Sequence, residues 1–291
     1  MAGTARSIAP IVEEFTETRA TPAWEWPWWH TTLRHSGTFG WIILIHLTAV
    51  AGLILFPLPG WRVFLAALAL VWIGGIGTTV CYHRAIAHRA LKLKPWASGI
   101  LIFFAEFNGS GAPVSWASNH RLHHASADTD EDISSPRYGF WWAHLRWLWQ
   151  ADVPSVDRFC PDLNRPQFVT WRYLQPPILA LSFFGGLYFG AAAFFWLGAI
   201  RLVFALHAQC FVNSICHTEP GIALGEDSSR NVPWLTLMHL FQGENWHRNH
   251  HSRPGLARLG WNWRQPDAGY FVIRALEMIG AATEVRDFRR S

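Results

Sequence analysis

Apolar and polar regions alternate along the chain, and four of the apolar stretches are of similar length. They cover residues 40–57, 60–81, 176–194 and 195–216. A helix needs roughly 20 apolar residues to cross the hydrocarbon core of a bilayer. The first two stretches are joined by PLPG, and the last two by a short turn near residues 191–196. The pattern predicts an all-α integral membrane protein with four transmembrane helices in two hairpins.

Basic residues indicate which side of the membrane each polar region faces. Of the 24 Lys and Arg, only Arg62 and Arg201 fall in or beside the hairpin turns, which leaves 24 − 2 = 22 on the other face. Cytoplasmic loops of membrane proteins carry the excess of Lys and Arg. We therefore expect a multi-pass protein whose termini and polar regions, residues 82–175 and 217–287, are cytoplasmic. The bacterial inner membrane and the endoplasmic reticulum both fit this orientation.

A single domain is expected over residues 38–287, between a lead-in of residues 1–37 and a tail of residues 288–291. The lead-in lacks the basic, apolar and small-residue pattern of a secretory signal. It ends in a Trp-rich stretch, and Trp favours the boundary between headgroups and water, so this end is predicted to be interfacial. The apolar run 97–107 is too short to span and includes Glu106, which predicts a buried or interfacial helix.

The composition supports a protein that faces lipid. The chain has 19 Trp and 20 Phe, and only 15% of its residues are charged. Its net charge of +4 comes from arginine, which binds phosphate and carboxylate well. Two interpretations of this charge stay open, namely anionic partners or the ordinary cytoplasmic bias. The four cysteines show no C-x-x-C spacing and are expected to be reduced and not to bind metal.

Histidine is the most informative residue for chemistry, because nine of the fifteen His lie in short segments. These segments are HRAIAH (83–88), HRLHH (120–124), NSICH (213–217) and HRNHH (247–251). Positions i, i+3 and i+4 share one face of a helix, so the three imidazoles of each H-x-x-H-H box are predicted to converge. Asn213 shares a face with His217 by the same rule. His83 and His88 diverge on a regular helix, which predicts a helix end or a distortion between them.

Neutral imidazoles in such clusters suit iron, zinc, copper or nickel. Because a structural zinc uses four ligands, nine histidines indicate two ions with four or five protein ligands each. The remaining histidines are expected to be structural. They are His30, His35, His46, His144, His207 and His239. His207 lies inside a predicted span and is also a candidate for lining a substrate channel. The acidic run DTDED (128–132) is interpreted as a solvated loop or helix N-cap rather than a carboxylate metal site.

Six segments resemble the membrane fatty-acyl desaturases of the stearoyl-CoA (acyl-CoA delta-9) desaturase type. They are GTTVCYHRAIAHRALKL, SWASNHRLHHASADTDED, PRYGFWWAHLRWL, VNSICH, SSRNVPW and GENWHRNHHS. The resemblance covers about residues 37–287 and implies four spanning helices that carry a cytoplasmic helical cap. It also implies a non-haem di-iron centre with two Fe ions (Fe²⁺/Fe³⁺), with Asn213 contributing through a water. The implied histidine ligands are His83, His88, His120, His123, His124, His217, His247, His250 and His251.

The resemblance further implies an oxygen-dependent reaction that removes two hydrogens from adjacent methylenes of a saturated acyl chain. The products are a cis double bond and water. An unactivated C–H bond offers no handle for acid–base attack, so a metal-generated oxidant in a dry cavity is required. The implied partners are an acyl thioester, acyl-CoA first, the lipid bilayer, and an external electron donor such as ferredoxin or cytochrome with its reductase. No nucleic-acid partner is expected.

Other functions stay open at this point. A histidine-box enzyme that hydroxylates an alkyl chain would share the metal site, although the NSICH and SSRN segments favour the desaturase. A zinc-dependent membrane hydrolase or a non-catalytic metal-binding receptor would use fewer histidines, and the hydrolase would need a zinc-bound water near a general base. The sequence leaves the double-bond position, the chain length and the carrier (coenzyme A, carrier protein or phospholipid) undetermined.

Overall fold

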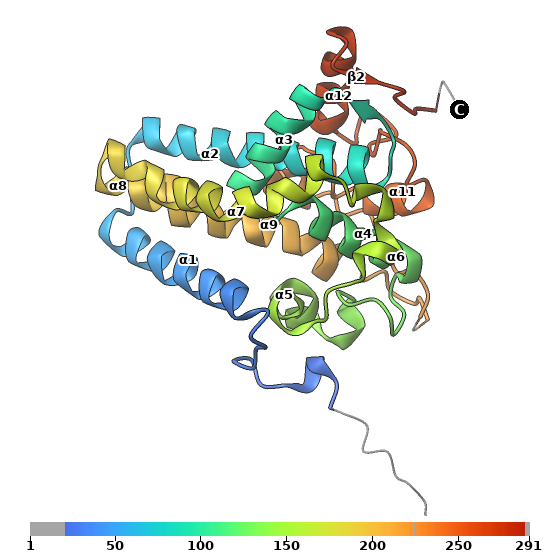
Figure 1. The fold of residues 1–291 in the computed structure, drawn as a ribbon, viewed down its shortest axis with the longest axis horizontal. Coiled ribbons are helices and arrows are strands. Elements are labelled where there is room, and N and C mark those ends of the chain that lie inside the picture. Colours follow the sequence, from blue (N-terminus) through green and yellow to red (C-terminus); the bar gives the residue numbers. More distant parts are fainter. Residues whose placement is uncertain (1–20, 224, 289–291) are drawn as a thin grey trace, which may run out of the picture.

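The computed structural model describes residues 21–223 and 225–288 of the chain. Long helices form a bundle at one end of the molecule, and short helices and loops form a cap at the other (Figure 1). The predicted lead-in is therefore described only from Thr21, and the predicted tail only at Phe288. Apart from two short strands, the regular structure of the described residues is helical, as the apolar pattern predicts.

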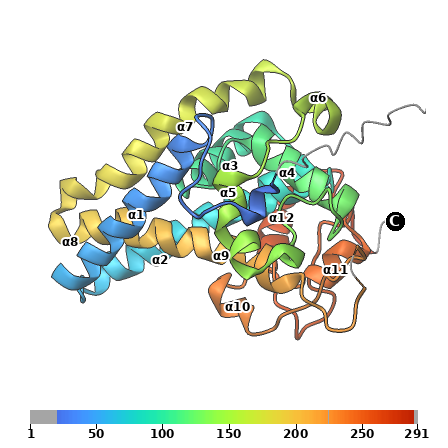
Figure 2. The same ribbon diagram turned by 90° about the horizontal axis from the view of Figure 1, so that it is seen from below.

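Four helical stretches lie alongside one another in the bundle (Figures 1 and 2). They are α1 (Ser36–Leu55); α2 (Trp61–Ile76) continued by the π-helix η2 (Gly77–Ala87); α7 (Pro166–Phe184) continued by η6 (Gly185–Phe189); and the run of α8 (Ala191–Ala193), η7 (Phe194–Ile200) and α9 (Arg201–Cys216). Three helices are long and apolar enough to cross a bilayer, namely Ser36–Leu55, Trp61–Ala87 and Ala191–Cys216. The protein is therefore a membrane protein, in agreement with the composition.

The third apolar stretch forms a helix with other bounds than predicted. α7 begins at Pro166 rather than at residue 176, and Pro176 and Pro177 lie inside it. It ends at Phe184, where the 3₁₀ turn η6 and Gly190, with φ of 101°, reverse the chain. Only glycine adopts this backbone conformation without strain. The residues on both sides of the turn are apolar, so hydropathy alone could not separate α7 from the helix that follows it.

The cap consists of the segments that lie before, between and after the bundle helices. Its helices are η1 (Ala23–Glu25), α3 (Pro95–Phe107), α4 (Pro113–Ser126), η3 (Pro136–Tyr138), η4 (Trp142–Arg146), α5 (Trp147–Gln150), α6 (Val156–Phe159), η5 (Pro161–Leu163), α10 (Leu235–Met238), α11 (His247–Ser252) and α12 (Ala268–Met278). Two strands, β1 (Lys92–Leu93) and β2 (Ala282–Thr283), pair antiparallel, with Lys92 opposite Thr283. Proline opens both α3 and α4, where its fixed φ suits the first helical position.

The short apolar run before the second histidine box is a separate helix, α3, as predicted. It packs closely on η2, because a Cβ added to Gly77 would lie 2.4 Å from the carbonyl oxygen of Leu101. A shared core joins η2, α3 and α4 and includes Tyr82, Ile102 and Ala117. The first and second histidine boxes are therefore held on one packed unit.

Arg201 was predicted to lie beside a hairpin turn, and this prediction is wrong. It lies within the continuous helix Ala191–Cys216 and is 1% exposed. Its guanidinium donates to the Asn108 side-chain oxygen at 2.9 Å and to the Leu197 carbonyl at 2.7 Å, and it also contacts the hydroxyl of Ser182. A buried charge requires such partners, so Arg201 fastens the end of α3 to the bundle rather than marking a membrane face.

Candidate metal centre

Nine histidines meet in the cap just beyond the bundle, in two groups. The five-histidine group contains His83, His88, His120, His124 and His250. The four-histidine group contains His123, His217, His247 and His251. Within each group, one nitrogen from every ring lies within 4.8 Å of the others. These are the nine histidines that the sequence motifs singled out, and the division into five and four matches the predicted number of ligands for each ion.

The two H-x-x-H-H boxes do not converge as predicted, because each box is divided between the groups. On α4, His120 and His124 belong to the five-histidine group and His123 to the other. On α11, His247 and His251 belong to the four-histidine group and His250 to the other. At 3.6 residues per turn, i+4 lies about 40° to one side of i, and i+3 lies about 60° to the other side. Each helix therefore stands between the groups and contributes to both.

The first box reaches one group through a distorted helix, as its spacing predicts. η2 is a π-helix, and the N–H of His88 donates to the carbonyl of His83, five residues earlier, at 3.1 Å. The wider π turn carries positions i and i+5 onto one face, and such turns are frequent at functional sites. The ring centres of His83 and His88 are 5.0 Å apart as a result.

The Nε2 atoms of the four-histidine group form a closed ring. The separations are 3.0 Å from His123 to His217, 2.8 Å from His217 to His247, 3.1 Å from His247 to His251 and 3.4 Å from His251 to His123. Nitrogens bound to one metal at 2.0–2.1 Å lie about 2.8–3.0 Å apart in a square arrangement and about 3.3–3.4 Å apart in a tetrahedral one. The dimensions of the ring are thus those of a metal coordination shell.

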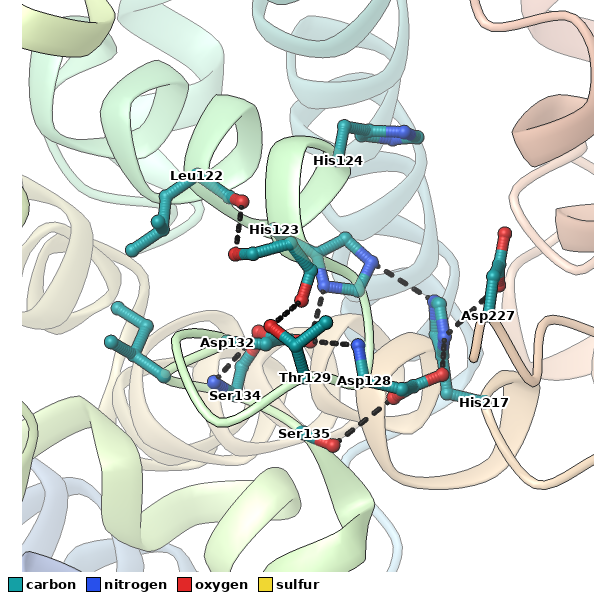
Figure 3. Close-up of polar contacts among 12 residues, drawn as sticks. Leu122, His123, His124, Asp128, Thr129, Asp132, Ser134, Ser135, His217 and Asp227 are labelled. Atoms are coloured by element: carbon teal, nitrogen blue, oxygen red, sulfur yellow. Dashed lines mark hydrogen bonds and ion pairs between the residues drawn. The ribbon is translucent and has the colours of Figure 1, made fainter. Parts of the chain in front are cut away.

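Carboxylates decide which nitrogen of these rings faces the centre (Figure 3). The Nδ1 of His123 lies 2.9 Å from Asp132, that of His217 lies 3.0 Å from Asp128, and that of His251 lies 2.8 Å from Asp227. A carboxylate can only accept, so Nδ1 carries the proton and each Nε2 presents a lone pair to the centre. Lone pairs this close repel one another unless a cation lies among them. The donor set therefore fits a metal site.

The prediction that the acidic run DTDED is a solvated loop is wrong for two of its residues. Asp128 and Asp132 are buried, and only the side chains between them, such as Asp130, stay exposed. Burial alone would raise the pKa of Asp128, but hydrogen bonds from His217 and Ser228 lower this pKa to about 2. Asp128 is therefore an anion. Asp227 was not singled out at all, since the sequence contains no local signal that pairs it with His251.

The five-histidine group has similar separations between its Nε2 atoms but fewer carboxylates behind its rings. The Nε2 atom of His250 lies 3.0 Å from that of His83 and 2.9 Å from that of His124, while the Nε2 atoms of His88 and His120 are 2.7 Å apart. Among the described residues, only His83 of this group has a carboxylate at its Nδ1, that of Glu244 at 2.8 Å.

Electrostatics keep most of these rings neutral, as metal ligands must be. Burial, and then repulsion from neighbouring imidazoles, lowers the pKa values of five rings well below the usual range. They are His88, His120, His124, His247 and His250. The side chain of Glu244, in contrast to these rings, is kept in its charged form. Burial would raise its pKa, but the charge and hydrogen bond of His83 lower this pKa to about 2.

Two arginines inside the boxes were missed by the sequence reasoning. Arg84 is 1% exposed, donates to Asp267 at 2.8 Å and also reaches the carbonyls of Gln242 and Ala257. It fastens η2 to the segments on either side of α11. Arg121 donates to Asp162 at 2.6 Å and to the carbonyl of Ile86 at 2.8 Å, which joins α4 to η2. The signal for both was present, since each follows a box histidine directly.

The six histidines outside the boxes lie apart from both groups, and three of them form a chain. His46 Nε2 lies 3.0 Å from His207 Nε2, and His207 Nδ1 lies 2.8 Å from His144 Nε2. His144 then contacts the hydroxyl of Ser214 at 2.9 Å. The other three have single contacts, namely His30 with Trp26, His35 with Thr32 and His239 with the carbonyl of Ala208.

Asn213, the residue expected to act through a water, is half-buried in the last turn of α9. His217 directly follows that helix and belongs to the four-histidine group. This position is compatible with the expectation, and the water-mediated contact stays a prediction.

Comparisons with known proteins agree with this site. The sequence model of the fatty acid desaturase family matches residues 59–259, which include all nine clustered histidines. The chain is 36% identical over 253 residues to "Delta-9 acyl-lipid desaturase 1" of Arabidopsis thaliana, covering 84% of this chain and 81% of that protein. It is 33% identical over 238 residues to "sn-1 stearoyl-lipid 9-desaturase" of Anabaena variabilis, covering 78% and 85%.

A third relative is named for an acyl-CoA substrate. The chain is 31% identical over 287 residues to "Icosanoyl-CoA 5-desaturase" of Limnanthes douglasii, covering 94% of this chain and 78% of that protein. The family match spans more than half of the chain, and it contains both groups of histidines. The chain therefore belongs to the fatty acid desaturase family and is an oxidoreductase that desaturates fatty-acyl groups.

Proposed function

We propose that the protein is an oxygen-dependent desaturase that places a cis double bond in a saturated acyl chain at a centre of two iron ions. One ion is held by the five-histidine group and the other by the four-histidine group, with Asn213 acting through a water. The main support is the closed ring of Nε2 atoms, 2.8 to 3.4 Å apart, whose lone pairs face one another. Imidazole with open positions suits iron that reacts with oxygen.

The bound iron pair would supply the activation of dioxygen that removal of an unactivated hydrogen needs. The chain's own residues prepare that centre. Asp128, Asp132 and Asp227 hold three imidazoles in the tautomer that presents Nε2. Arg84 and Arg121 would fix the boxes relative to one another through their hydrogen bonds to neighbouring segments. The apolar bundle next to the centre provides a dry environment for the acyl chain.

The finer topology is part of this proposal. α7 would act as the fourth spanning helix beside the three apolar ones, so that α1 with α2 and α7 with α9 form two hairpins. The cap and both termini would then face the cytoplasm, because only Arg62 of the 24 basic residues lies beside a hairpin turn. Residues 38–287 would form a single domain. Fusing a reporter to the turn at Pro59 and to the C-terminus distinguishes the two faces.

The substrate is proposed as a saturated acyl chain desaturated at the delta-9 position, carried as acyl-CoA. A specific observation favours a second carrier, a membrane lipid, because the relatives from Arabidopsis thaliana and Anabaena variabilis are named for acyl-lipid and stearoyl-lipid. The relative from Limnanthes douglasii is named for an acyl-CoA. Supplying isotope-labelled stearoyl-CoA, or membranes with labelled stearoyl lipid, to the same membrane-embedded protein separates the two carriers.

The function is tested by expressing the full chain in a host and analysing its fatty acids by mass spectrometry with double-bond localisation. A new cis-9 monoene, absent with the His124→Ala variant, is the expected result. A hydroxy acid in its place would identify the hydroxylase. Zinc in the purified protein, with hydrolysis that needs neither oxygen nor reductant, would identify the hydrolase. Either result would contradict the proposal.

A further inference from the structure

The proposed reaction needs a second substrate, a source of electrons. Its balance is R–CH₂–CH₂–R′ + O₂ + 2 e⁻ + 2 H⁺ → R–CH=CH–R′ + 2 H₂O. The acyl chain gives up two hydrogens, and oxygen is reduced to two waters with two further electrons from outside the protein. A carrier of one electron must therefore dock and leave twice in each turnover. Its docking surface has to lie close to the histidine groups.

α11 offers a route from the surface to both groups, because it carries histidines of each. This helix contributes His250 to one group and His247 and His251 to the other. At its end, the N–H of Arg253 donates to the carbonyls of Asn249 and His250, at 3.2 and 3.0 Å. α11 lies at the end of the molecule opposite the outer tips of α1 and α8, in both views (Figures 1 and 2). A soluble protein could reach this end without approaching the bilayer.

Hydrogen bonds join the loop after α11 to Asn249, a residue of α11. The N–H of Trp261 donates to the Gln265 side-chain oxygen at 2.8 Å. The Asn249 side-chain nitrogen donates to that same oxygen at 3.0 Å and to the carbonyl of Leu259 at 2.9 Å. Asn249 directly precedes His250 in the chain. Three contacts thus connect the loop to Asn249, the backbone neighbour of a histidine of the five-histidine group.

The surface above this path is basic and aromatic. It consists of Arg253, Arg264, Arg286, Trp261 and Trp263, called here the arginine–tryptophan surface. Arg253 lies over the ring of Phe288 at 5.3 Å, and Trp261 packs against the same ring at 5.4 Å. Arg264 lies over the ring of Trp263, which is 85% exposed. Arg and Trp are the residue types that carry most binding energy at protein interfaces.

The positive charge of this surface is not neutralised locally. None of its three arginines has a carboxylate within ion-pair distance in the part of the chain that the structure describes. The nearby carboxylates are engaged elsewhere, Glu284 with Lys92 and Asp287 with the hydroxyl of Tyr270. The segment from residue 253 to 264 contains three arginines and no acidic residue. Unpaired surface charge of one sign attracts and orients a partner of the opposite sign.

We propose that the arginine–tryptophan surface docks a small acidic protein that carries one electron and passes it to the histidine groups through the end of α11. This inference rests on the proposed oxygen-dependent function, since a hydrolase would need no donor. The acidic face of the carrier meets the three arginines, and Trp263 packs against its apolar rim. The place of α11, at the end of the molecule opposite the outer tips of α1 and α8, favours a soluble protein over a lipid headgroup as the occupant.

Binding is measured first, so that the result does not depend on turnover. The probe is an oxidised plant-type [2Fe–2S] ferredoxin, an acidic one-electron carrier, added to the full chain in lipid nanodiscs. The triple variant Arg253→Glu, Arg264→Glu and Arg286→Glu is expected to bind about tenfold or more weakly at low salt. Arg34→Glu, an exposed arginine just before α1, is the matched control and should bind as the parent does. Equal binding by the triple variant would overturn the proposal.

Turnover with two reductants then separates docking from catalysis. With reduced ferredoxin, the triple variant should show a raised KM for the carrier, and raising salt from about 0.01 to about 0.15 M should weaken the parent much more than the variant. With reduced methyl viologen, a small dye, variant and parent should desaturate at equal rates. A raised KM for acyl-CoA with unchanged ferredoxin binding would assign the surface to the acyl carrier and overturn the proposal. Absence of any double bond in the parent with either reductant would refute the proposed function, while the binding result still decides the docking.

Discussion

The two histidine groups share the boxes on α4 and α11 and have similar Nε2 separations, but the residues behind their rings differ. In the four-histidine group, three rings have a carboxylate at Nδ1, from Asp128, Asp132 and Asp227. In the five-histidine group, among the described residues, Glu244 alone plays this part, behind His83. The four-histidine group thus has fewer imidazoles and more negative charge close to them.

This difference shows two ways of holding neutral rings in place. An anion behind an imidazole fixes its tautomer and makes it a stronger ligand. Where such anions are scarce, the rings are fixed by helix packing and by arginines, as η2 and α4 are by the buried Arg84 and the half-buried Arg121. We expect the four-histidine group to depend on its carboxylates, and the five-histidine group to depend on the π-helix and on the number of its rings.

Removing a ring should have the largest effect, and it tests whether the groups hold separate ions. His124→Ala truncates the five-histidine group and His247→Ala the four-histidine group. Each change is expected to abolish desaturation and to lower the metal content by about one ion per chain, because each group loses a nitrogen of its coordination shell. Metal analysis of the purified protein and fatty-acid profiling measure both effects. Retained turnover in either variant would contradict the ligand assignment.

Removing a carboxylate from the four-histidine group should be the next largest effect. Asp128→Asn removes the negative charge behind His217 and replaces one of the two carboxylate oxygens that accept from His217, Ser228 and Ser135 with an amide nitrogen. We expect metal affinity or turnover to fall by about 10–100-fold, as for other carboxylates behind a ligating imidazole. Asp130→Asn is the matched control, because Asp130 is 83% exposed, and it should retain the parent's metal content. A similar loss in both variants would indicate a general charge effect.

The corresponding change in the five-histidine group should be milder. Glu244→Gln keeps an acceptor oxygen for His83, and this ring is one of five. A loss near the lower end of the range, about tenfold in metal affinity, is expected. Competition with a chelator measures the affinities of this variant and of Asp128→Asn side by side. If Glu244→Gln costs more than Asp128→Asn, the two groups do not differ in the way described above.

A histidine outside both groups should affect stability and leave the metal content unchanged. His207→Leu leaves the Nε2 atoms of His46 and His144 without their partner. An unsatisfied buried polar group costs about 1–3 kcal/mol, so the unfolding temperature should fall. Thermal unfolding in detergent, with metal analysis of the same sample, tests both parts. Loss of iron would place the chain of His46, His207 and His144 in the function of the centre.

Part of the site could be predicted because helix periodicity is a local property. The boxes identified the nine rings, although not how they divide between the groups, and the five-residue spacing of His83 and His88 predicted the distortion that proved to be a π-helix. The apolar pattern likewise predicted the helices that became Ser36–Leu55, Trp61–Ala87 and Ala191–Cys216. These features follow from the order of residues within about 20 positions.

Other features depend on segments that are distant in sequence. The third bundle helix begins at Pro166 rather than at residue 176. Its end is set by the turn at Gly190 and not by hydropathy. Asp128 and Asp132 became buried acceptors although their local sequence is typical of a solvated loop. His46, His144 and His207 met although their spacing gave no reason to group them.

By itself, the sequence of this protein determined the identity of the nine rings, their helical spacing and the apolar helices beside them. Only the tertiary structure decided that each box is divided between two groups and which rings have an anion behind them. The physical reason is that rotation about a helix axis places i+3 and i+4 on opposite sides of i. Which side finds a partner then depends on where α4, α11 and the end of α9 lie relative to one another.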